Sequence, residues 1–417
     1  MSSELSAKVK DIMEREMQSL GASILSKQCL HLNIIEDDIR PEDLPALASR
    51  LSELMKTCGG YDKAKRVYRD IGKLQDLDEL AEMEDDIHKA EMLENLAVAS
   101  LYAGEFSKAS EYIDKLLADA NEQDNKAAKA KYLNLMGTLH KEKADFDLAL
   151  ALFEKGLIEA EEAKDPRHIS RSFIHIGDIY WYKGDFRRSL AAYMQAVKKG
   201  EDDSDIGAAH VGLGNVYQGR NELAKAITNY VEALSKLKNT DNYRDLARAY
   251  NNLGDTYLIM KDWENALENF KLGEEFGEKG GWVYVQAFTM FNSAEVLVNM
   301  GEMDRAKEML DKSIDMLEKI DSTPGLAGAY HVYGMYYREK EEWDKMEEYY
   351  RKSIEYYAEV HMLHYVARYT YELGKGFKAM GEKERALKEF KDALKFYKEI
   401  ELDPMAAIVE KDLMKMQ

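Results

Sequence analysis

One pattern recurs eight times along the chain and limits its fold more than any other feature. A small residue is followed 12 positions later by a second residue, usually small, and 4 positions after that by a large apolar residue. The first position of the pattern is occupied by Ala97, Gly137, Gly177, Gly214, Gly254, Ala294, Gly334 and Gly374. Successive copies lie 40 residues apart, with a single interval of 37, which indicates tandem repeats.

The other positions of the pattern predict how each repeat packs. The second position holds Ala109, Ala149, Ser189, Ala226, Ala266, Ala306, Met346 and Ala386. The large position holds Ile113, Phe153, Tyr193, Tyr230, Phe270, Leu310, Tyr350 and Phe390. Apolar residues at helical spacing on both sides of a short turn predict two antiparallel amphipathic helices. Four of these turns contain a glycine, namely Gly104, Gly184, Gly301 and Gly381.

Glycine inside a helix costs about 1 kcal/mol relative to alanine. Its recurrence at one position of the repeat therefore predicts that two helices approach closely there. The large residue of the second helix is expected to fill the space beside it.

Composition and charge narrow the class of protein. Hydrophobic residues make up 45% of the chain and prolines number only five, which is typical of a folded, largely helical protein. The net charge of −20 opposes binding to nucleic acid and to anionic membranes, so neither is expected as a partner, and it favours neutral or basic ones. The N-terminal segment is charged from its fourth residue, unlike a signal peptide. The longest stretch without Asp, Glu, Lys or Arg, 322–337, is too short to cross a bilayer.

The two cysteines, Cys29 and Cys58, have neither the number nor the spacing of a disulfide framework or a zinc site. Unpaired thiols are typical of a reducing compartment. A cytoplasmic location is therefore expected.

The residues of the pattern give the chain a resemblance to the tetratricopeptide repeat family over about residues 89–401. The resemblance implies an all-α, right-handed superhelical solenoid of tandem helix hairpins with helical caps. The usual repeat of the family has about 34 residues, so a period of 40 implies longer helices. Such helices are similar to the extended repeats of kinesin light chains and bacterial peptide-sensing regulators. The repeats usually carry an aromatic or apolar residue three positions after the first small residue, and Ser100 departs from this in the first copy.

Three regions are expected on this basis: an N-terminal region (1–80), eight repeats (81–402) and a C-terminal capping helix (403–417). Pro324 and Pro404 lie 80 residues apart, which places the start of the last helix in phase with the repeats.

The N-terminal region, 1–80, fits the pattern less well. Gly59 and Gly60 have the phase of a turn, with Ala64 and Tyr68 at the following positions of the pattern. This predicts a degenerate leading repeat behind a helical cap. A small separate helical module is the alternative.

No catalytic motif is present in the sequence. It contains no phosphate-binding loop, no GxSxG and no HExxH, so neither an enzyme nor a cofactor is expected. His361 and His364 could share a helix face, with Glu359 nearby, but a third ligand is not evident. No metal site is therefore predicted.

The resemblance implies that the first helix of each repeat lines a concave groove that binds other polypeptides. The predicted partner-binding residues are Lys131, Asn134, Lys141, Arg171, Asp178, Trp181, Asn215, Arg248, Asn251, Asn252, Asp255, Asn292, Arg338 and Arg368. Amide side chains can pair with both the N–H and the C=O groups of an extended peptide. Replacing Asn251 and Asn252 with alanine is therefore expected to weaken partner binding with little effect on the melting temperature.

One family subtype, the clamp that holds a C-terminal carboxylate of chaperones, does not fit. Asn215 and Asn252 match its two amides, but Val211, Phe288 and Asn292 stand where it requires basic residues.

The expected function is that of a non-enzymatic scaffold or adaptor that binds a partner peptide or helix in the groove. One alternative is an assembly factor that holds a subunit of a larger enzyme complex on its concave or convex face. Another is a signalling regulator in which peptide binding controls an N-terminal effector module. The sequence identifies neither the partner nor the pathway nor the oligomeric state.

Overall fold

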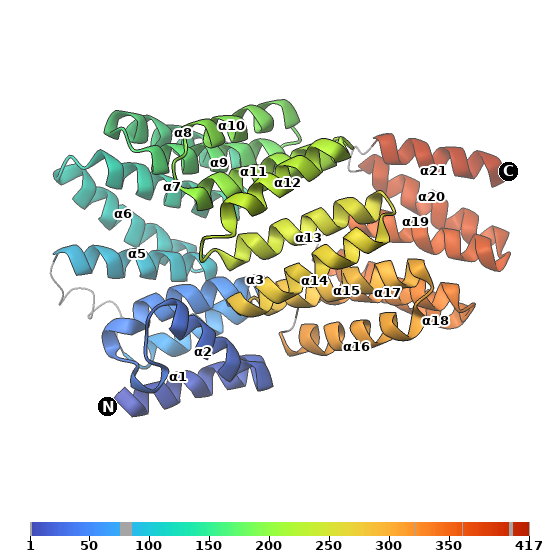
Figure 1. Ribbon diagram of the computed structural model, residues 1–417, viewed down its shortest axis with the longest axis horizontal. Helices are drawn as coiled ribbons and strands as arrows, with labels where there is room; N and C mark the ends of the chain where they lie inside the picture. Colours follow the sequence, from blue (N-terminus) through green and yellow to red (C-terminus); the bar gives the residue numbers. More distant parts are fainter. Residues whose placement is uncertain (1, 76–85, 321, 361, 400–402, 417) are drawn as a thin grey trace. The chain divides into compact units, whose positions relative to one another are not determined.

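The computed structural model describes all residues except 1, 76–85, 321, 361, 400–402 and 417. Within this part of the chain every regular element is a helix and no strand is present (Figure 1). The predicted all-α class is confirmed.

A group of helices precedes the repeats and differs from the sequence-based expectation. It comprises α1 (Ser2–Met17), η1 (Gln18–Leu20), α2 (Gly21–His31), η2 (Glu36–Asp38), η3 (Pro41–Asp43) and α3 (Leu44–Gly72). The hairpin turn predicted at Gly59 and Gly60 is wrong, because α3 continues as one helix of 29 residues through both positions. Glycine permits a turn conformation but also adopts ordinary helical dihedral angles, so its presence does not force a break.

Helix α3 packs against the first helix of the leading repeat, α5 (Asp86–Tyr102). The hydroxyl of Ser100 on α5 donates a 2.9 Å hydrogen bond to the hydroxyl of Tyr68 on α3. An aromatic ring from α3 thus lies beside the position where the first repeat lacks its own.

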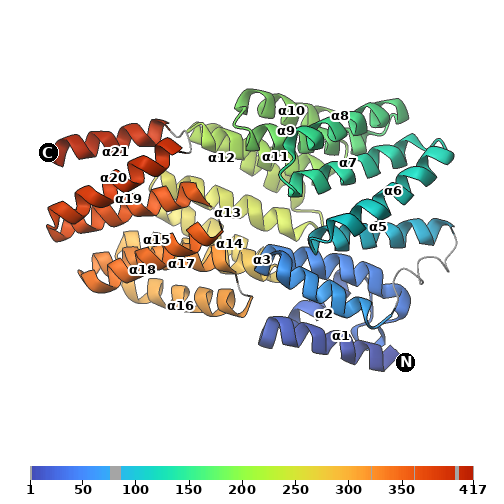
Figure 2. The same ribbon diagram turned by 180° about the vertical axis from the view of Figure 1, so that it is seen from behind.

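Tandem helix hairpins follow (Figure 2). Their helix pairs are α5 with α6 (Phe106–Glu122), α7 (Lys126–Glu142) with α8 (Phe146–Ala163), α9 (Pro166–Tyr182) with α10 (Phe186–Lys199), α11 (Asp203–Gly219) with α12 (Leu223–Leu237), α13 (Tyr243–Ile259) with α14 (Trp263–Gly280), α15 (Val283–Met300) with α16 (Met303–Lys319), α17 (Thr323–Glu339) with α18 (Trp343–Glu359), and α19 (Leu363–Met380) with α20 (Lys383–Glu399).

The spacing of the helices reproduces the period of the sequence. First helices begin at residues 86, 126, 166, 203, 243, 283, 323 and 363. The helix α21 (Asp403–Met416) begins 40 residues after α19 and packs against α20. The predicted tandem solenoid is confirmed, whereas the capping role of α21 stays a prediction.

Each hairpin turn contains one residue in the left-handed conformation. The four predicted glycines have φ angles of 73° to 88° and are Gly104, Gly184, Gly301 and Gly381. The other four turns have φ angles of 57° to 61° at Ala144, Asn221, Lys261 and Glu341. Position in the repeat therefore imposes the left-handed turn even where no glycine relieves its steric cost.

The predicted close approach of the two helices is present at the glycine positions. A Cβ atom on Gly254 would lie 2.6 Å from the ring of Phe270, and one on Gly214 would lie 2.4 Å from the ring of Tyr230. Both rings are fully buried. The same contact recurs between Gly137 and Phe153, Gly177 and Tyr193, Gly334 and Tyr350, and Gly374 and Phe390.

The chain divides into two compact units, unit 1 (Met1–Val283) and unit 2 (Tyr284–Gln417). The regions expected from the sequence, 1–80, 81–402 and 403–417, do not coincide with this division and stay predictions.

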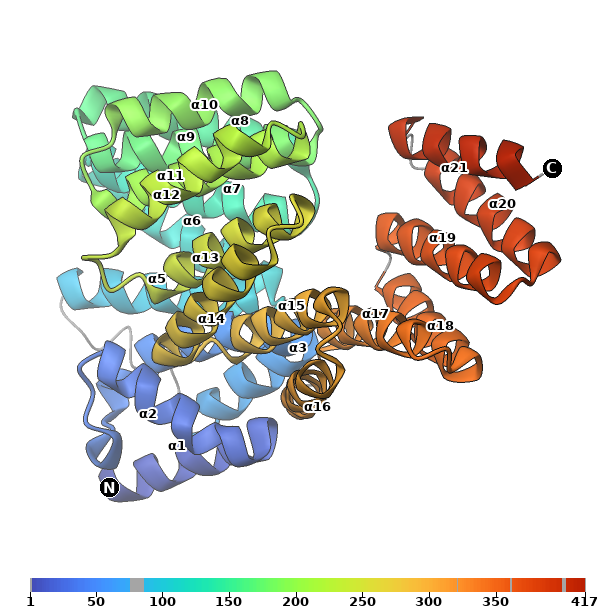
Figure 3. The same cartoon turned by 45° about the vertical axis from the view of Figure 1, so that its right-hand side comes forward.

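Within unit 1 the N-terminal helices contact the end of the fifth repeat (Figure 3). The Nε2 atom of Gln28 on α2 donates a buried 3.1 Å hydrogen bond to the carbonyl oxygen of Gly280. The Nζ atom of Lys27 donates to the carbonyl oxygen of Glu278 at 2.6 Å. These bonds join residues about 250 positions apart and bring side-chain donors from α2 to carbonyl groups at the end of α14.

The indole ring of Trp282 completes this contact and is 1% exposed. The guanidinium carbon of Arg50 lies 4.9 Å from the ring centroid, and that of Arg244 lies 5.2 Å from it. Arg244 also forms an ion pair with Glu53 of α3. We call the contacts of Lys27, Gln28, Arg50 and Glu53 with Arg244 and residues 278–282 the N-terminal closure.

Candidate functional site

The first helices of unit 1 form a continuous layer, in which α7 contacts α9, α9 contacts α11 and α11 contacts α13. Eleven of the residues predicted to bind a partner lie on this layer. We call them the first-helix face: Lys131, Asn134, Lys141, Arg171, Asp178, Trp181, Asn215, Arg248, Asn251, Asn252 and Asp255.

At the N-terminal end of this face, Asn134 is buried within the layer, with 5% of its surface exposed. Its Nδ2 atom donates to the hydroxyl of Ser172 on α9 at 2.9 Å, and that hydroxyl donates to its Oδ1 atom at 3.1 Å. Its neighbour Lys131 forms an ion pair with Glu94 of α5, and both side chains are partly exposed. The Asn134 amide therefore joins two repeats, and Lys131 remains accessible.

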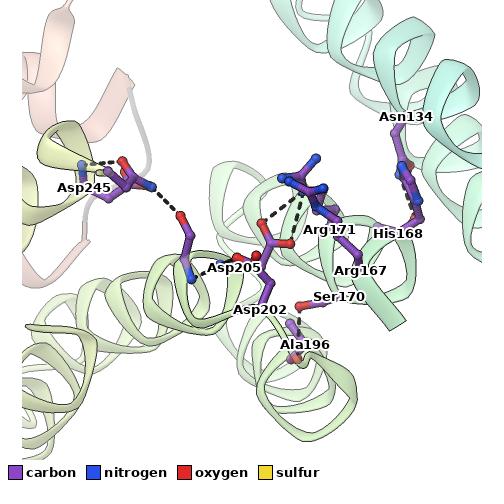
Figure 4. Close-up of polar contacts among 12 residues, drawn as sticks. Asn134, Arg167, His168, Ser170, Arg171, Ala196, Asp202, Asp205 and Asp245 are labelled. Carbon is purple, nitrogen blue, oxygen red and sulfur yellow. Dashed lines mark hydrogen bonds and ion pairs between the residues drawn. The ribbon is translucent and has the colours of Figure 1, made fainter. Parts of the chain in front are cut away.

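Arg171 joins α9 to α11 (Figure 4). Its Nε atom donates to both carboxylate oxygens of Asp205, at 3.0 and 3.1 Å. Burial raises the pKa of Asp205, and the charge of Arg171 opposes that effect. The pair thus holds the guanidinium group in place through Nε.

The amides of the fourth and fifth repeats are bound to one another. Asn252 donates through Nδ2 to the Oδ1 atom of Asn215 at 2.8 Å. The same Oδ1 atom accepts the hydroxyl of Tyr230 at 2.8 Å. Asn251 is only 8% exposed. Replacing Asn251 and Asn252 together would remove a bond between repeats, so the melting temperature should also fall, contrary to the expectation from sequence.

Of the five remaining predicted residues on this face, three contact other side chains and two are described by their exposure. Asp178 accepts the hydroxyl of Tyr193 at 2.6 Å, and Arg248 donates to Asp245 at 2.9 Å. Lys141 is partly exposed, and the indole of Trp181 is 40% exposed. Asp255 contacts Asn251 at 3.5 Å.

A cavity of about 170 Å³ opens on the first-helix face between α5, α7 and α9. Its lining consists of Glu94, Val98, Lys131, Asn134, Leu135, Thr138, His168, Arg171 and His175. Three predicted residues, Lys131, Asn134 and Arg171, are thereby brought together. Two permanent cations and one carboxylate give the lining an excess of positive charge, in contrast to the chain as a whole.

His175 adds an uncharged ring to this cavity. Burial, assisted by the charges of Lys141 and Arg171, lowers the pKa of His175 to about 3. Its Nδ1 atom is buried and has no hydrogen-bond partner among the described residues. The cavity therefore contains a neutral imidazole at neutral pH.

In unit 2 the predicted residues occupy the corresponding helices α15, α17 and α19. Asn292 is buried, with 7% of its surface exposed. Arg338 lies 3.1 Å from Glu339 and 3.7 Å from Glu372. The guanidinium carbon of Arg368 lies 5.6 Å from the ring centroid of Tyr369.

Sequence reasoning missed three polar residues of the cavity, namely Glu94, His168 and His175. The two histidines stand three positions before and four positions after Arg171, so they share its face of α9. Their spacing from Arg171 would have identified both histidines as residues of the same helix face. Glu94 belongs to the previous repeat and lies 37 residues before Lys131, which is close to one period.

Comparison with protein families identifies the repeat. Two family models described as tetratricopeptide repeat match the chain, one over residues 205–278 and 325–399 and the other over residues 170–198. These parts of the chain are therefore tetratricopeptide repeats. Among curated proteins no match is found.

Three solved structures share this fold. The apo form of RapI is 15% identical over 65% of this chain and 98% of its own, with a TM-score of 0.57. Aspartyl phosphate phosphatase F from Bacillus subtilis is 15% identical over 86% of this chain and 94% of its own, also with a TM-score of 0.57. The apo form of the quorum sensor NprR from B. thuringiensis is 16% identical over 84% of this chain and 98% of its own, again at 0.57. At these identities the likeness concerns the fold.

The sequence predicts neither a membrane span nor a metal site. None of the helices in the described part of the chain is long and apolar enough to cross a bilayer. No group of three or more His, Cys, Asp or Glu residues with the geometry of a metal site occurs in that same part. His361 of the predicted histidine pair lies outside the described residues.

Cys29 is a buried free thiol, and burial raises its pKa to about 11.

Proposed function

We propose that this tetratricopeptide-repeat protein is a non-enzymatic scaffold or adaptor that binds a peptide or a helix of a protein partner on its first-helix face. The observation that carries the proposal is the accessible cavity lined by Lys131, Arg171 and Thr138. It offers fixed donors and a cation on a rigid layer of helices, which is what recognition of an extended segment requires.

The groups that we propose to bind the partner differ from those expected from the sequence, because the amides are already bonded. Asn134, Asn215 and Asn252 already bond to other side chains, so the proposed contacts come from the exposed cations and from apolar surface such as Trp181. Binding through a few charged and aromatic anchors is typical of specific interfaces.

A peptide-responsive signalling regulator remains the closest alternative. One solved structure of the same fold is that of a quorum sensor, and another is that of an aspartyl phosphate phosphatase. We propose no catalytic role for the present chain, because its sequence contains none of the catalytic motifs named above. An assembly factor for a larger enzyme complex is the other alternative. A cytoplasmic location is part of the proposal.

Reversing the charge of Lys131 tests the proposal. Peptides of about seven residues selected from a random phage-displayed library on the full chain would be measured by fluorescence anisotropy. Lys131→Glu should weaken their binding about tenfold, equivalent to 1.4 kcal/mol, because a second carboxylate beside Glu94 repels acceptor groups of the peptide. Its effect on the melting temperature should be small, since an exposed ion pair contributes little.

The matched control is Lys155→Glu, the same reversal at an exposed position of α8 in the same repeat. Affinity within about twofold of the unmodified chain is expected for this variant. Equal losses in both variants, or no loss in Lys131→Glu, would place binding elsewhere on the molecule.

A further inference from the structure

A second cavity, of about 600 Å³, lies at the hairpin turn of the third repeat and shares no residue with the cavity on the first-helix face. Its volume is within the range of ligand-binding sites. The lining comes from α8, the end of α9, the turn itself and the start of α10. We call this cavity the third-repeat groove, and its lining consists of Leu150, Tyr180, Lys183, Gly184, Asp185, Phe186, Arg187 and Arg188.

One side of the third-repeat groove is apolar. Leu150 and Tyr180 pack against the buried cluster between the second and third repeats, and Phe186 packs against the next cluster. All three side chains are only partly buried. The apolar surface continues beyond the groove, because Phe146, one helical turn before Leu150, stacks on Tyr182 with the ring centroids 5.7 Å apart. Tyr182 is 56% exposed, and exposed aromatic surface of this kind is typical of interaction sites.

The other side of the groove is basic, and two of its three cations form exposed ion pairs. Arg188 donates to Asp185 at 2.5 Å, and its guanidinium carbon lies 4.5 Å from the ring centroid of Tyr180. Lys183 pairs with Asp147. The Arg188 side chain is 64% exposed, and the Asp147 side chain is 90% exposed. Because exposed ion pairs contribute little to stability, both cations can exchange these carboxylates for those of a ligand.

The third cation, Arg187, supplies the excess of positive charge. It is exposed, and within the part of the chain that the structure describes no carboxylate forms an ion pair with it. Asp185, the carboxylate in the lining, already accepts from Arg188. The repeat pattern does not require this cation, since the equivalent positions of the other seven hairpins hold Ser107, Asp147, Ala224, Glu264, Asp304, Asp344 and Glu384. The basic character thus belongs to the turn of the third repeat.

We infer that the third-repeat groove is a second interaction surface, which binds a short segment of a protein partner that carries both acidic and apolar side chains. The apolar side chains of the segment cover Leu150 and Phe186. Its carboxylates pair with Arg187 and replace Asp147 at Lys183. A long polyanion or an anionic membrane fits less well, because the net charge of −20 repels it outside the groove. This surface is independent of the first-helix face, so the chain can hold two polypeptides at once.

Reversing the charge of Arg187 in the full chain tests the groove. The probe is a fluorescently labelled pool of random peptides of about 12 residues, built from Asp, Glu, Leu, Phe and Ala and blocked at both ends. Fluorescence anisotropy should show that the unmodified chain binds this pool and that added salt weakens the binding. Arg187→Glu should weaken it about tenfold, because the change removes a cation and places a second carboxylate beside Asp185. Arg187→Gln should cause a smaller loss.

The matched control is Lys225→Glu, a reversal at the turn of the fourth repeat. Lys225 pairs with Glu222 and is 63% exposed, much like Arg188, but Ala224 stands where the third repeat has Arg187. Affinity within about twofold of the unmodified chain is expected. The melting temperature separates binding from folding. Arg187→Glu should leave it unchanged or raise it, since a carboxylate is favoured over a cation in the first turn of α10.

Three further comparisons identify the surface and the class of ligand. A peptide selected on the first-helix face should not displace the acidic pool, and a pool with Ser in place of Leu and Phe should bind about fivefold more weakly. Vesicles of phosphatidylserine and phosphatidylcholine should not be bound.

Displacement by the selected peptide, or equal affinity of the unmodified chain and Arg187→Glu, would overturn the groove but leave the proposed function intact. Failure of the unmodified chain to bind the acidic pool would overturn it as well. Binding of the vesicles that Arg187→Glu abolishes, without binding of the pool, would identify a membrane as the partner and contradict a protein segment.

Discussion

Replacing Phe270 with alanine is expected to lower the free energy of unfolding by about 3–5 kcal/mol. The ring is fully buried and occupies the space above Gly254, where a Cβ atom would lie 2.6 Å from it. Its removal leaves a cavity between α13 and α14 that the two helix backbones cannot close. Urea denaturation followed by far-ultraviolet circular dichroism measures the loss. Val231→Ala, at a position that is 49% exposed, should change stability by less than about 0.5 kcal/mol.

A second substitution at Gly254 tests the same contact from the opposite side. In the unmodified chain Gly254→Ala should cost about 1–3 kcal/mol, because its methyl group meets the Phe270 ring. In the Phe270→Ala background the same change should stabilise the protein by about 1 kcal/mol, since alanine favours the helix and fills part of the cavity. Additive losses in the double variant would contradict the close contact between the two helices.

The second large effect is expected at the N-terminal closure, where Trp282→Ala should cost about 3–5 kcal/mol. The indole is 1% exposed and lies close to Arg50 and Arg244, so the change removes both apolar burial and cation–π attraction. Hydrogen exchange measured by mass spectrometry should also show faster exchange in α2, because Gln28 bonds to Gly280 beside the missing ring.

Trp181→Ala provides the control for the closure, because that indole is 40% exposed. Its loss should be below about 1 kcal/mol, with exchange in α2 unchanged. If Trp282→Ala left the exchange of α2 at its original rate, the N-terminal helices would be held by other contacts.

The sequence was sufficient to predict the hairpins, because their determinants lie close together in the chain. Gly254 and Phe270 are 16 residues apart, and the same pair of positions recurs in every repeat. The N-terminal closure depends instead on Gln28 and Gly280, which are 252 residues apart and show no shared pattern. The continuity of α3 through Gly59 and Gly60 was missed because glycine at the phase of a turn does not decide whether packing will straighten the helix.

The candidate site was predicted only in part. Residue type placed Asn134 and Asn252 on the correct helices but did not indicate that their amides would bond to Ser172 and Asn215 of neighbouring repeats. Those pairs are 38 and 37 residues apart, close to one period, so polar residues separated by a full repeat are better paired with each other before they are assigned to a ligand. To predict that the Tyr350 hydroxyl lacks a hydrogen-bond partner among the described residues, one would need to know which positions face its ring.

Hydrogen exchange of the full chain with and without a selected peptide tests most directly whether ligands bind the first-helix face. We expect slower exchange in α7, α9 and α11, whose side chains include Lys131 and Arg171, and little change in α8, α10 and α12. Protection concentrated in α8, α10 and α12 would contradict binding on the first-helix face.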